Sequence, residues 1–311
     1  MSERRRVALI HDRASLTASS PSENLAETIA DIRRVLHAVA IPVSRPLDRF
    51  GRRLLKARPD VVFNLCESVD GDPAGEPLVA AWLELLGIPF TGNPSRALKT
   101  ALDKHLAKLT LRDQGIPTPR WVLADGPSFR GLRQVRFPAI VKPRHEDASV
   151  GIDRRSVVRS PRALAERVRY VTARWRQEAL VEEYVDGREF NVALLGGRVL
   201  AISEIKFSIS PRIVTYDAKW KPGSREDRGT TPVCPSSAPK RVRGIAVNAA
   251  AALGCTGPVR VDLRDHHVID INPNPDLSRG AGFARCARAA GMDYESLLEE
   301  LIREAHSPAR R

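Results

Sequence analysis

The chain has 311 residues, of which 42% are hydrophobic and 28% are charged, a composition typical of globular domains. This length suffices for two to three domains. The apolar run near the N-terminus covers only residues 7–10, too short for a signal peptide or a membrane span, and no apolar stretch of either length is found elsewhere in the sequence. The four cysteines are scattered, which favours reduced thiols over a zinc site or disulfides. We therefore expect a soluble, cytoplasmic protein without membrane association.

The net charge is +13, and it comes mainly from 41 arginines, since the chain contains only nine lysines. A basic excess can attract nucleic acid or another polyanion. Here, however, the arginines are dispersed, and aromatic side chains make up only 5%, so no stacking surface for bases is indicated. We expect a solvated, arginine-rich surface and no nucleic-acid partner, with a polyanion-binding surface as the alternative.

The first part of the chain alternates between strand and helix patterns. Short apolar strands are expected at residues 6–10, 59–65 and 87–92. Helical spacing of apolar residues occurs at 24–39 and 77–86. This alternation predicts a parallel sheet covered by helices.

The remainder of the chain mixes longer strands with helices. A helix is predicted over residues 95–114, because Gly115 and Pro117 follow it as a stop signal. The other expected helices are 161–170, 240–253 and 294–304. The expected strands are 121–124, 137–143, 179–185, 188–205, 259–265 and 267–273. Residues 208–239 are rich in Pro, Ser, Gly and charge, and such a long segment inside a compact domain is usually functional or mobile.

Oxygen-bearing side chains lie on the last two expected strands. Asp270 and Asn272 are two residues apart and therefore project from the same strand face, and Asp262 can meet them across a tight hairpin. Two carboxylates and an amide oxygen are hard ligands that suit Mg²⁺ and leave coordination positions for phosphates. The alternative is that they are turn residues at strand ends.

Two other segments could hold a nucleotide. Lys142 ends an expected strand and can reach phosphate as a point charge, while the small residues in 148–151 would let backbone N–H groups approach phosphate oxygens. The acidic residues in 182–189 bracket apolar ones and could hold an adenine edge and ribose hydroxyls. The alternatives are a surface lysine and an ordinary strand pair with solvated glutamates. Among the few lysines, Lys104, Lys142 and Lys219 fall beside the candidate phosphate-facing segments, although chance could also place them there.

Taken in order, these segments resemble D-alanine–D-alanine ligases of the ATP-grasp superfamily. The resemblance rests on TALDKHLAKLTLRDQGIPTP, FPAIVKPRHEDASVG, ALVEEYVDGREFNVALLGG, YDAKW, VCPSS and GPVRVDLRDHHVIDINPNPD, and upstream on VFNLCESVDGDPAGEPLVAAWLELLGIPFTGN. It covers most of the chain. It implies an α/β and α+β fold, with a Rossmann-like N-terminal domain at 1–98 followed by a two-subdomain ATP-grasp domain at 99–311, the subdomains covering about 99–180 and 181–311.

The resemblance also implies roles for individual residues. ATP would be held by Lys104, Lys142, Ser149, Glu182, Tyr184, Val185 and Glu189. Two Mg²⁺ ions, with Mn²⁺ as an alternative, would bind to Asp262, Asp270 and Asn272. Lys219 would reach the γ-phosphate from the long segment, and Arg260 would steady the developing oxyanion. The implied reaction is ATP-dependent ligation of a carboxylate to an amine through an acyl phosphate.

The amino-acid half of the sequence departs from the family pattern. EDASVG stands where the family has EGSSVG, and AKW stands where it has AKY, so Ala148 and Trp220 replace hydroxyl-bearing residues. After the hairpin, PNPDLSRGA replaces TSPGMTSHS and brings Arg279 and Gly280 into the stretch that helps hold the second substrate. Glu23 is the only candidate for the N-terminal glutamate of the substrate site.

These departures predict amino-acid or small-peptide substrates other than D-alanine alone. A true D-alanine–D-alanine ligase is one alternative, and a non-catalytic ATP-binding or polyanion-binding protein on the same scaffold is another. Asp270 also stands where the family usually has the longer glutamate. The identity of the substrates, the product length and a homodimeric state stay open at this point.

Overall fold

A parallel sheet forms the first domain of the computed structural model, which describes residues 5–16, 23–234 and 238–307. The strands are β1 (Val7–Asp12), β2 (Val39–Val43) and β3 (Val61–Asn64), in the order β2-β1-β3. Every residue of β1 and β3 is buried, as expected for parallel strands covered on both faces. The predicted parallel sheet is confirmed.

Helices α1 (Glu23–Leu36), α2 (Leu47–Ala57) and α3 (Glu76–Leu85) accompany this sheet. The helix predicted over 24–39 was too long, because His37 has a positive φ of 52° and Val39 pairs with Ala8 as the start of β2. Strand β2 and helix α2 were not predicted. The strand expected at 87–92 is reduced to one parallel bridge between Phe90 and Val62.

The helix predicted over 95–114 is in fact two helices, α4 (Ser95–Leu102) and α5 (Lys104–Asp113). Asp103 lies between them in an extended conformation, and its side chain accepts hydrogen bonds from the N–H groups of His105 and Leu106. Such an N-cap satisfies otherwise unpaired donors at the start of a helix. The Asp103 carboxylate also accepts a bond of 2.8 Å from Arg144 Nε, which ties this break to the end of a distant strand.

A four-stranded antiparallel sheet follows, in the order β4-β7-β5-β6. Its strands are β4 (Trp121–Ala124), β5 (Ala139–Pro143), β6 (Val157–Val158) and β7 (Ala179–Glu183), and α6 (Pro161–Trp175) covers one face. Alternate residues such as Val141 and Val181 pack in the core with α6. Because side chains alternate along a strand, their neighbours Lys142 and Glu182 face the other side.

A five-stranded antiparallel sheet in the order β10-β9-β8-β11-β12 completes the fold. Its strands are β8 (Glu189–Leu195), β9 (Arg198–Phe207), β10 (Thr230–Val233), β11 (Val259–Arg264) and β12 (His267–Asn272). Val192 and Val261 pack against α9 (Lys240–Ala252), so the intervening residues, among them Asn191, Arg260 and Asp262, face the opposite side.

The long polar segment at 208–239 contains secondary structure that was not predicted. It contains the short helices α7 (Tyr216–Trp220) and α8 (Arg225–Arg228) before β10, while residues 235–237 lie outside the described part. The stretch after β12 includes α10 (Gly282–Ala289), which was not predicted, and the chain then forms α11 (Tyr294–Ala305). Short 3-10 helices occur at Ala14–Leu16, Pro73–Gly75, Arg130–Gln134 and Arg154–Ser156. Across the described residues, each helix is too short or too polar to cross a bilayer.

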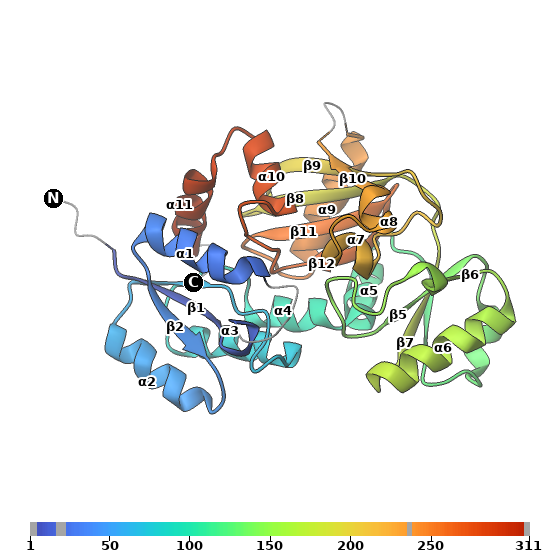
Figure 1. The fold of residues 1–311 in the computed structure, drawn as a ribbon, viewed down its shortest axis with the longest axis horizontal. Helices are drawn as coiled ribbons and strands as arrows, with labels where there is room; N and C mark the ends of the chain where they lie inside the picture. Colours follow the sequence, from blue (N-terminus) through green and yellow to red (C-terminus); the bar gives the residue numbers. More distant parts are fainter. Residues whose placement is uncertain (1–4, 17–22, 235–237, 308–311) are drawn as a thin grey trace.

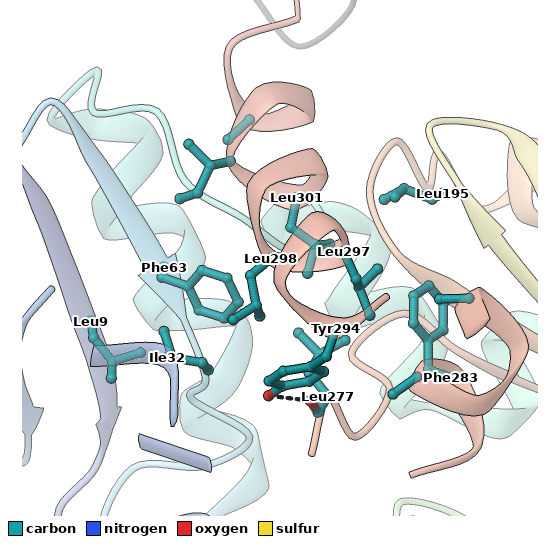
Figure 2. Close-up of a cluster of buried hydrophobic side chains, with 14 of the residues drawn as sticks. Leu9, Ile32, Phe63, Leu195, Leu277, Phe283, Tyr294, Leu297, Leu298 and Leu301 are labelled. Atoms are coloured by element: carbon teal, nitrogen blue, oxygen red, sulfur yellow. Dashed lines mark hydrogen bonds between the residues drawn. The ribbon is translucent and has the colours of Figure 1, made fainter. Parts of the chain in front are cut away.

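The C-terminal helix α11 packs on the sheet of the first domain, although that sheet comes from the opposite end of the chain (Figure 1). Figure 2 shows Leu297, Leu298 and Leu301 of α11 between Phe63 on β3 and Phe283 on α10. This apolar cluster joins the first domain to the five-stranded sheet.

Replacing Leu298 by Ala tests this joint. Leu298 is fully buried, so the change should lower the free energy of unfolding by about 2–5 kcal/mol, the range for truncating a buried leucine. Leu85→Ala is the matched control, because this leucine is 84% exposed and should change stability by less than about 0.5 kcal/mol. Urea denaturation measures both, and equal effects would contradict a structural role of the cluster.

Candidate active site

A cavity of about 1160 Å³ lies where the two antiparallel sheets and the first domain meet. Lys142 and Glu182 line it from the four-stranded sheet, Asp262 and Asp270 from the five-stranded sheet, and Glu76 from the first domain. Charged residues from distant parts of the sequence therefore line one cavity.

A loop at 146–151 and the segment at 213–220 approach each other at the edge of this cavity. The loop turns sharply, with positive φ values at Ala148 and Ser149. Ser149 Oγ donates to the carbonyl of Val214 at 2.9 Å, and Trp220 Nε1 donates to the carbonyl of Ala148 at 3.0 Å. The backbone N–H of Tyr216 also donates to the carbonyl of Ile152, the residue that follows the loop, at 3.0 Å. The long segment is thus held against the loop.

The oxygen-bearing residues meet as the sequence predicted. In the β11–β12 hairpin, Asp262 pairs with Asp270 and Arg260 with Asn272. The Asp262 carboxylate accepts bonds from Arg260 Nε at 2.8 Å and from Asn191 Nδ2 at 2.9 Å. Asn272 Oδ1 accepts a bond of 2.8 Å from a backbone N–H two residues along. All three predicted ligands line the cavity.

These residues fit a divalent ion only in combination with further oxygen donors. In the described ranges, no group of three or more His, Cys, Asp or Glu side chains could hold a metal by itself. Two carboxylates and the Asn272 amide oxygen leave most positions of an octahedral Mg²⁺ shell open. Phosphate oxygens and water would have to supply the rest, which is the usual arrangement when Mg²⁺ binds with a nucleotide.

Four cations converge on Asp270. Burial alone would raise the pKa of its carboxyl, but Lys104, Lys142, Arg260 and Lys219 outweigh burial and lower this pKa. Burial, together with Arg260, lowers the pKa of Lys219 in spite of nearby carboxylates. The structure therefore brings together the three lysines and the arginine that the sequence singled out.

Lys104 also anchors the loop at 146–151. Its Nζ donates to the carbonyl of Glu146 at 2.6 Å and to Asp147 Oδ1 at 3.0 Å. Burial would lower the pKa of Lys104, but Asp147 and Asp270 raise it well above its ordinary value. Lys104 is therefore a fixed positive charge beside the loop.

Glu182 pairs with two lysines. Its side chain is 2% exposed and lies 3.1 Å from Lys142 Nζ and 2.7 Å from Lys108 Nζ. Burial would raise the pKa of Glu182, but both lysines together lower it. Sequence reasoning missed Lys108, although its position four residues after Lys104, on the same helix face, could have revealed it among so few lysines.

The residues predicted around a nucleoside lie close together. Tyr184 is buried against Ile140 and Ile213, and its hydroxyl donates to a backbone carbonyl at 3.2 Å. Glu189 Oε2 accepts a bond of 2.9 Å from Arg264 Nε. Burial raises the pKa of Glu189 despite this pairing. With Val185 these side chains line one part of the cavity, an apolar wall with a carboxylate at its edge.

Arg279 is not brought into the site. It is 43% exposed, pairs with Glu295 at 2.9 Å and Asp31 at 3.3 Å, and lies over the ring of Tyr294. It is absent from the cavity lining, whereas its neighbour Gly280 is present. The predicted substrate role of Arg279 is therefore not supported, because acidic residues of α1 and α11 hold its guanidinium at the surface. Glu23 begins α1, but its side chain lies outside what the structure describes.

Residues 111–303 match the family described as D-ala D-ala ligase C-terminus. The chain is 32% identical over 268 residues to a D-alanine–D-alanine ligase of Sphingopyxis alaskensis, covering 81% of this chain and 83% of that protein. The chain belongs to the D-alanine–D-alanine ligase family. It is thus an ATP-grasp ligase that forms carbon–nitrogen bonds, as the resemblance implied.

Two further proteins are similar to this chain. The protein named Uncharacterized protein y4sG, from Sinorhizobium fredii, is 34% identical over 256 residues, which cover 79% of this chain and 74% of that protein. The structure of a D-alanine–D-alanine ligase from Bacillus anthracis complexed with ATP superposes with a TM-score of 0.77 at 22% identity, covering 98% of this chain and 99% of that chain. This last similarity confirms the ATP-grasp fold.

Replacing Glu182 by Gln tests the buried charge cluster of this ligase. The change leaves two buried lysines without their partner and should cost about 3–5 kcal/mol of stability at neutral pH. Because folding lowers the pKa of Glu182, its contribution is present above its ordinary value of 4.5 and is lost as the pH falls further. Urea denaturation at pH 7 and pH 3.5 should therefore show a large difference from the parent that shrinks in acid.

Glu183→Gln is the control for this prediction. Glu183 is the next residue on β7, but because side chains alternate along a strand it points away from the lysines. Its loss should change stability by less than about 0.5 kcal/mol at either pH. A similar cost for both variants would show that the ion pairs of Glu182 do not set the stability.

Proposed function

We propose that this ligase joins an amino acid or small peptide to an amine through an acyl phosphate, in a pocket that differs from that of the D-alanine enzymes. The observation that carries the proposal is the convergence of four cations on Asp270, in a cavity that also holds the altered contact between Trp220 and Ala148. We place the reaction in the cytoplasm, where ATP is available, with small-molecule substrates and no nucleic-acid partner.

ATP would lie in the half of the cavity between the two antiparallel sheets. We propose that Lys104, Lys142 and the loop containing Ser149 hold its phosphates, since fixed cations and loop N–H groups favour phosphate. The adenine would lie against Tyr184 and Val185, and the free oxygen of Glu189 would meet the ribose. Glu182, whose carboxylate is occupied by lysines, would act by positioning Lys142.

The hairpin would hold two Mg²⁺ ions, or Mn²⁺ in their place, on Asp262, Asp270 and Asn272. When bound, these ions neutralise charge on the phosphate oxygens. Arg260 fixes the orientation of Asp262 through two hydrogen bonds of 2.8 Å, so that this carboxylate keeps its place when the substrates change charge.

The chemistry begins with a carboxylate, which is a poor acyl donor because its leaving group would be oxide. Its oxygen attacks the γ-phosphorus of ATP, the bond to ADP breaks, and an acyl phosphate forms. The amine nitrogen then attacks the acyl carbon, phosphate leaves, and the nitrogen loses a proton. Lys219 and Arg260 would stabilise the negative charge in both steps. The closed segment at 213–220 would exclude water from the acyl phosphate.

Asp270→Asn should lower amino-acid-dependent ADP release by at least about 100-fold, the scale of losing one preorganised electrostatic contact. The change removes one of the two carboxylates at the proposed metal site and unbalances the four cations around it. Asp113→Asn is the control, since Asp113 is 69% exposed and does not line the cavity. Parent-like turnover of Asp270→Asn at low millimolar Mg²⁺ would rule out the metal role.

A screen of D- and L-amino acids and dipeptides for ADP release is the experiment that tests the function as a whole. An amino-acid-dependent release supports the ligase mechanism. Nucleotide binding without release for any pair would instead support the non-catalytic scaffold that the sequence left as an alternative.

D-alanine alone should be a poor substrate pair, with kcat/KM at least tenfold below the best pair from the screen. Trp220 and Ala148 remove two hydroxyls, each of which could contribute about 0.5–1.5 kcal/mol of hydrogen bonding, and the indole is bonded to the loop. The double variant Trp220→Tyr with Ala148→Ser should raise kcat/KM for D-alanine. Efficient use of D-alanine by the parent, with nothing faster, would identify an ordinary D-alanine–D-alanine ligase.

A further inference from the structure

The first-domain wall of the cavity carries carboxylates that form no ion pair with the lysines and arginines that the structure describes. Glu67 and Glu76 lie in the segment that leads from β3 into α3, and Asp276 follows β12; all three line the cavity. Nearby lysines and arginines form their ion pairs with carboxylates other than these three. Lys104, for example, pairs with Asp147. This is unexpected in a chain with a net charge of +13.

Glu76 is the most constrained of these groups. Its side chain is only 8% exposed, and Oε1 accepts a bond of 2.7 Å from Asn274 Nδ2. The same Asn274 nitrogen donates to the carbonyl of Cys66 at 3.0 Å, so the amide is fixed. Oε2 has no hydrogen-bond partner among the residues that the structure describes, and the side chain borders the cavity.

The electrostatic surroundings favour a positive ligand. Burial raises the pKa of Glu76 to about 8, and Asp147 and Glu67 add to the shift. Glu67 itself is exposed, so the cost of burying a negative charge falls on Glu76. A carboxylate held out of water without a cation is costly. The position of Glu76 in the first turn of α3 suits a negative charge, but it does not explain a second carboxylate across the same wall.

We propose that Glu67 and Glu76 bind a second ammonium group, at the end of the substrate remote from its reacting carboxylate or amine and distinct from an α-ammonium, so that the preferred substrate is a basic amino acid or a diamine. This inference rests on the proposed function, because it assigns the substrate class of the same cavity. Cations gather at the Asp270 end and carboxylates at the first-domain wall. A flexible alkyl chain with an ammonium at its end would be oriented by this separation of charge.

Direct binding tests the inference without requiring turnover. Isothermal titration with lysine and with norleucine, which has no side-chain ammonium, should be done at pH 8.5 in the presence of ADP. The parent should bind lysine about tenfold or more tightly than norleucine, the change expected from one charge-assisted contact. Putrescine against butylamine makes the same comparison for a diamine and shows whether an α-carboxylate is needed.

Glu76→Gln and Glu67→Gln should each reduce the preference for lysine over norleucine about tenfold while leaving the Kd for ADP unchanged. Glu84→Gln is the control, since Glu84 is an exposed residue of α3 that bonds to Ser95. If Glu76→Gln does not fold, Glu67→Gln, whose side chain is more exposed, still provides the test.

The outcomes separate this inference from the proposed function. Equal binding of lysine and norleucine by the parent, or an unchanged preference in both variants, overturns the inference even when amino acids stimulate ADP release. A preference for lysine that both variants lose supports it even when no pair in the screen is turned over, in which case the proposed reaction fails and the ammonium site stands.

Discussion

The apolar contact between α11 and the sheet of the first domain holds the cavity together. Phe63, Leu298 and Phe283 belong to one buried cluster that joins the two ends of the chain (Figure 2). A second joint is the buried side chain of Asn93, which donates to the carbonyls of Pro258 and Pro273 at 2.6 Å. Because one wall of the cavity comes from the first domain, the distance between carboxylates and cations across the cavity depends on both joints.

Within that frame, one end of the cavity brings buried charges of both signs together. Four cations surround Asp270, and Glu182 holds two buried lysines. Removing several charges from water is costly, and a buried ion pair is often no more stable than apolar packing. We therefore interpret the buried charges as preorganised contacts for phosphate groups and not as a source of stability. Phosphate groups are best stabilised by fixed cations that do not rearrange during the reaction.

The segment at 208–233 shows how family membership and altered chemistry coexist. Ser149 and Tyr216 hold the segment against the loop through hydrogen bonds to backbone carbonyls. Because the acceptors are backbone groups, these bonds do not depend on the identity of the neighbouring side chains. Trp220 adds a bond from its indole to Ala148 at the same edge. A closed segment can thus be kept while the side chains that would contact a small amino acid are replaced.

The sequence by itself determined the family, the parallel sheet, and the meeting of Asp262 with Asp270, because strand alternation and a two-residue turn are local properties. Tertiary structure alone decided the rest. It broke the helix at Asp103, where Arg144 bonds to the capping carboxylate, and it turned Arg279 outward to Asp31 and Glu295. It also paired Glu182 with Lys108. These partners are distant in sequence, so their effect on a charged side chain appears only when the chain is folded.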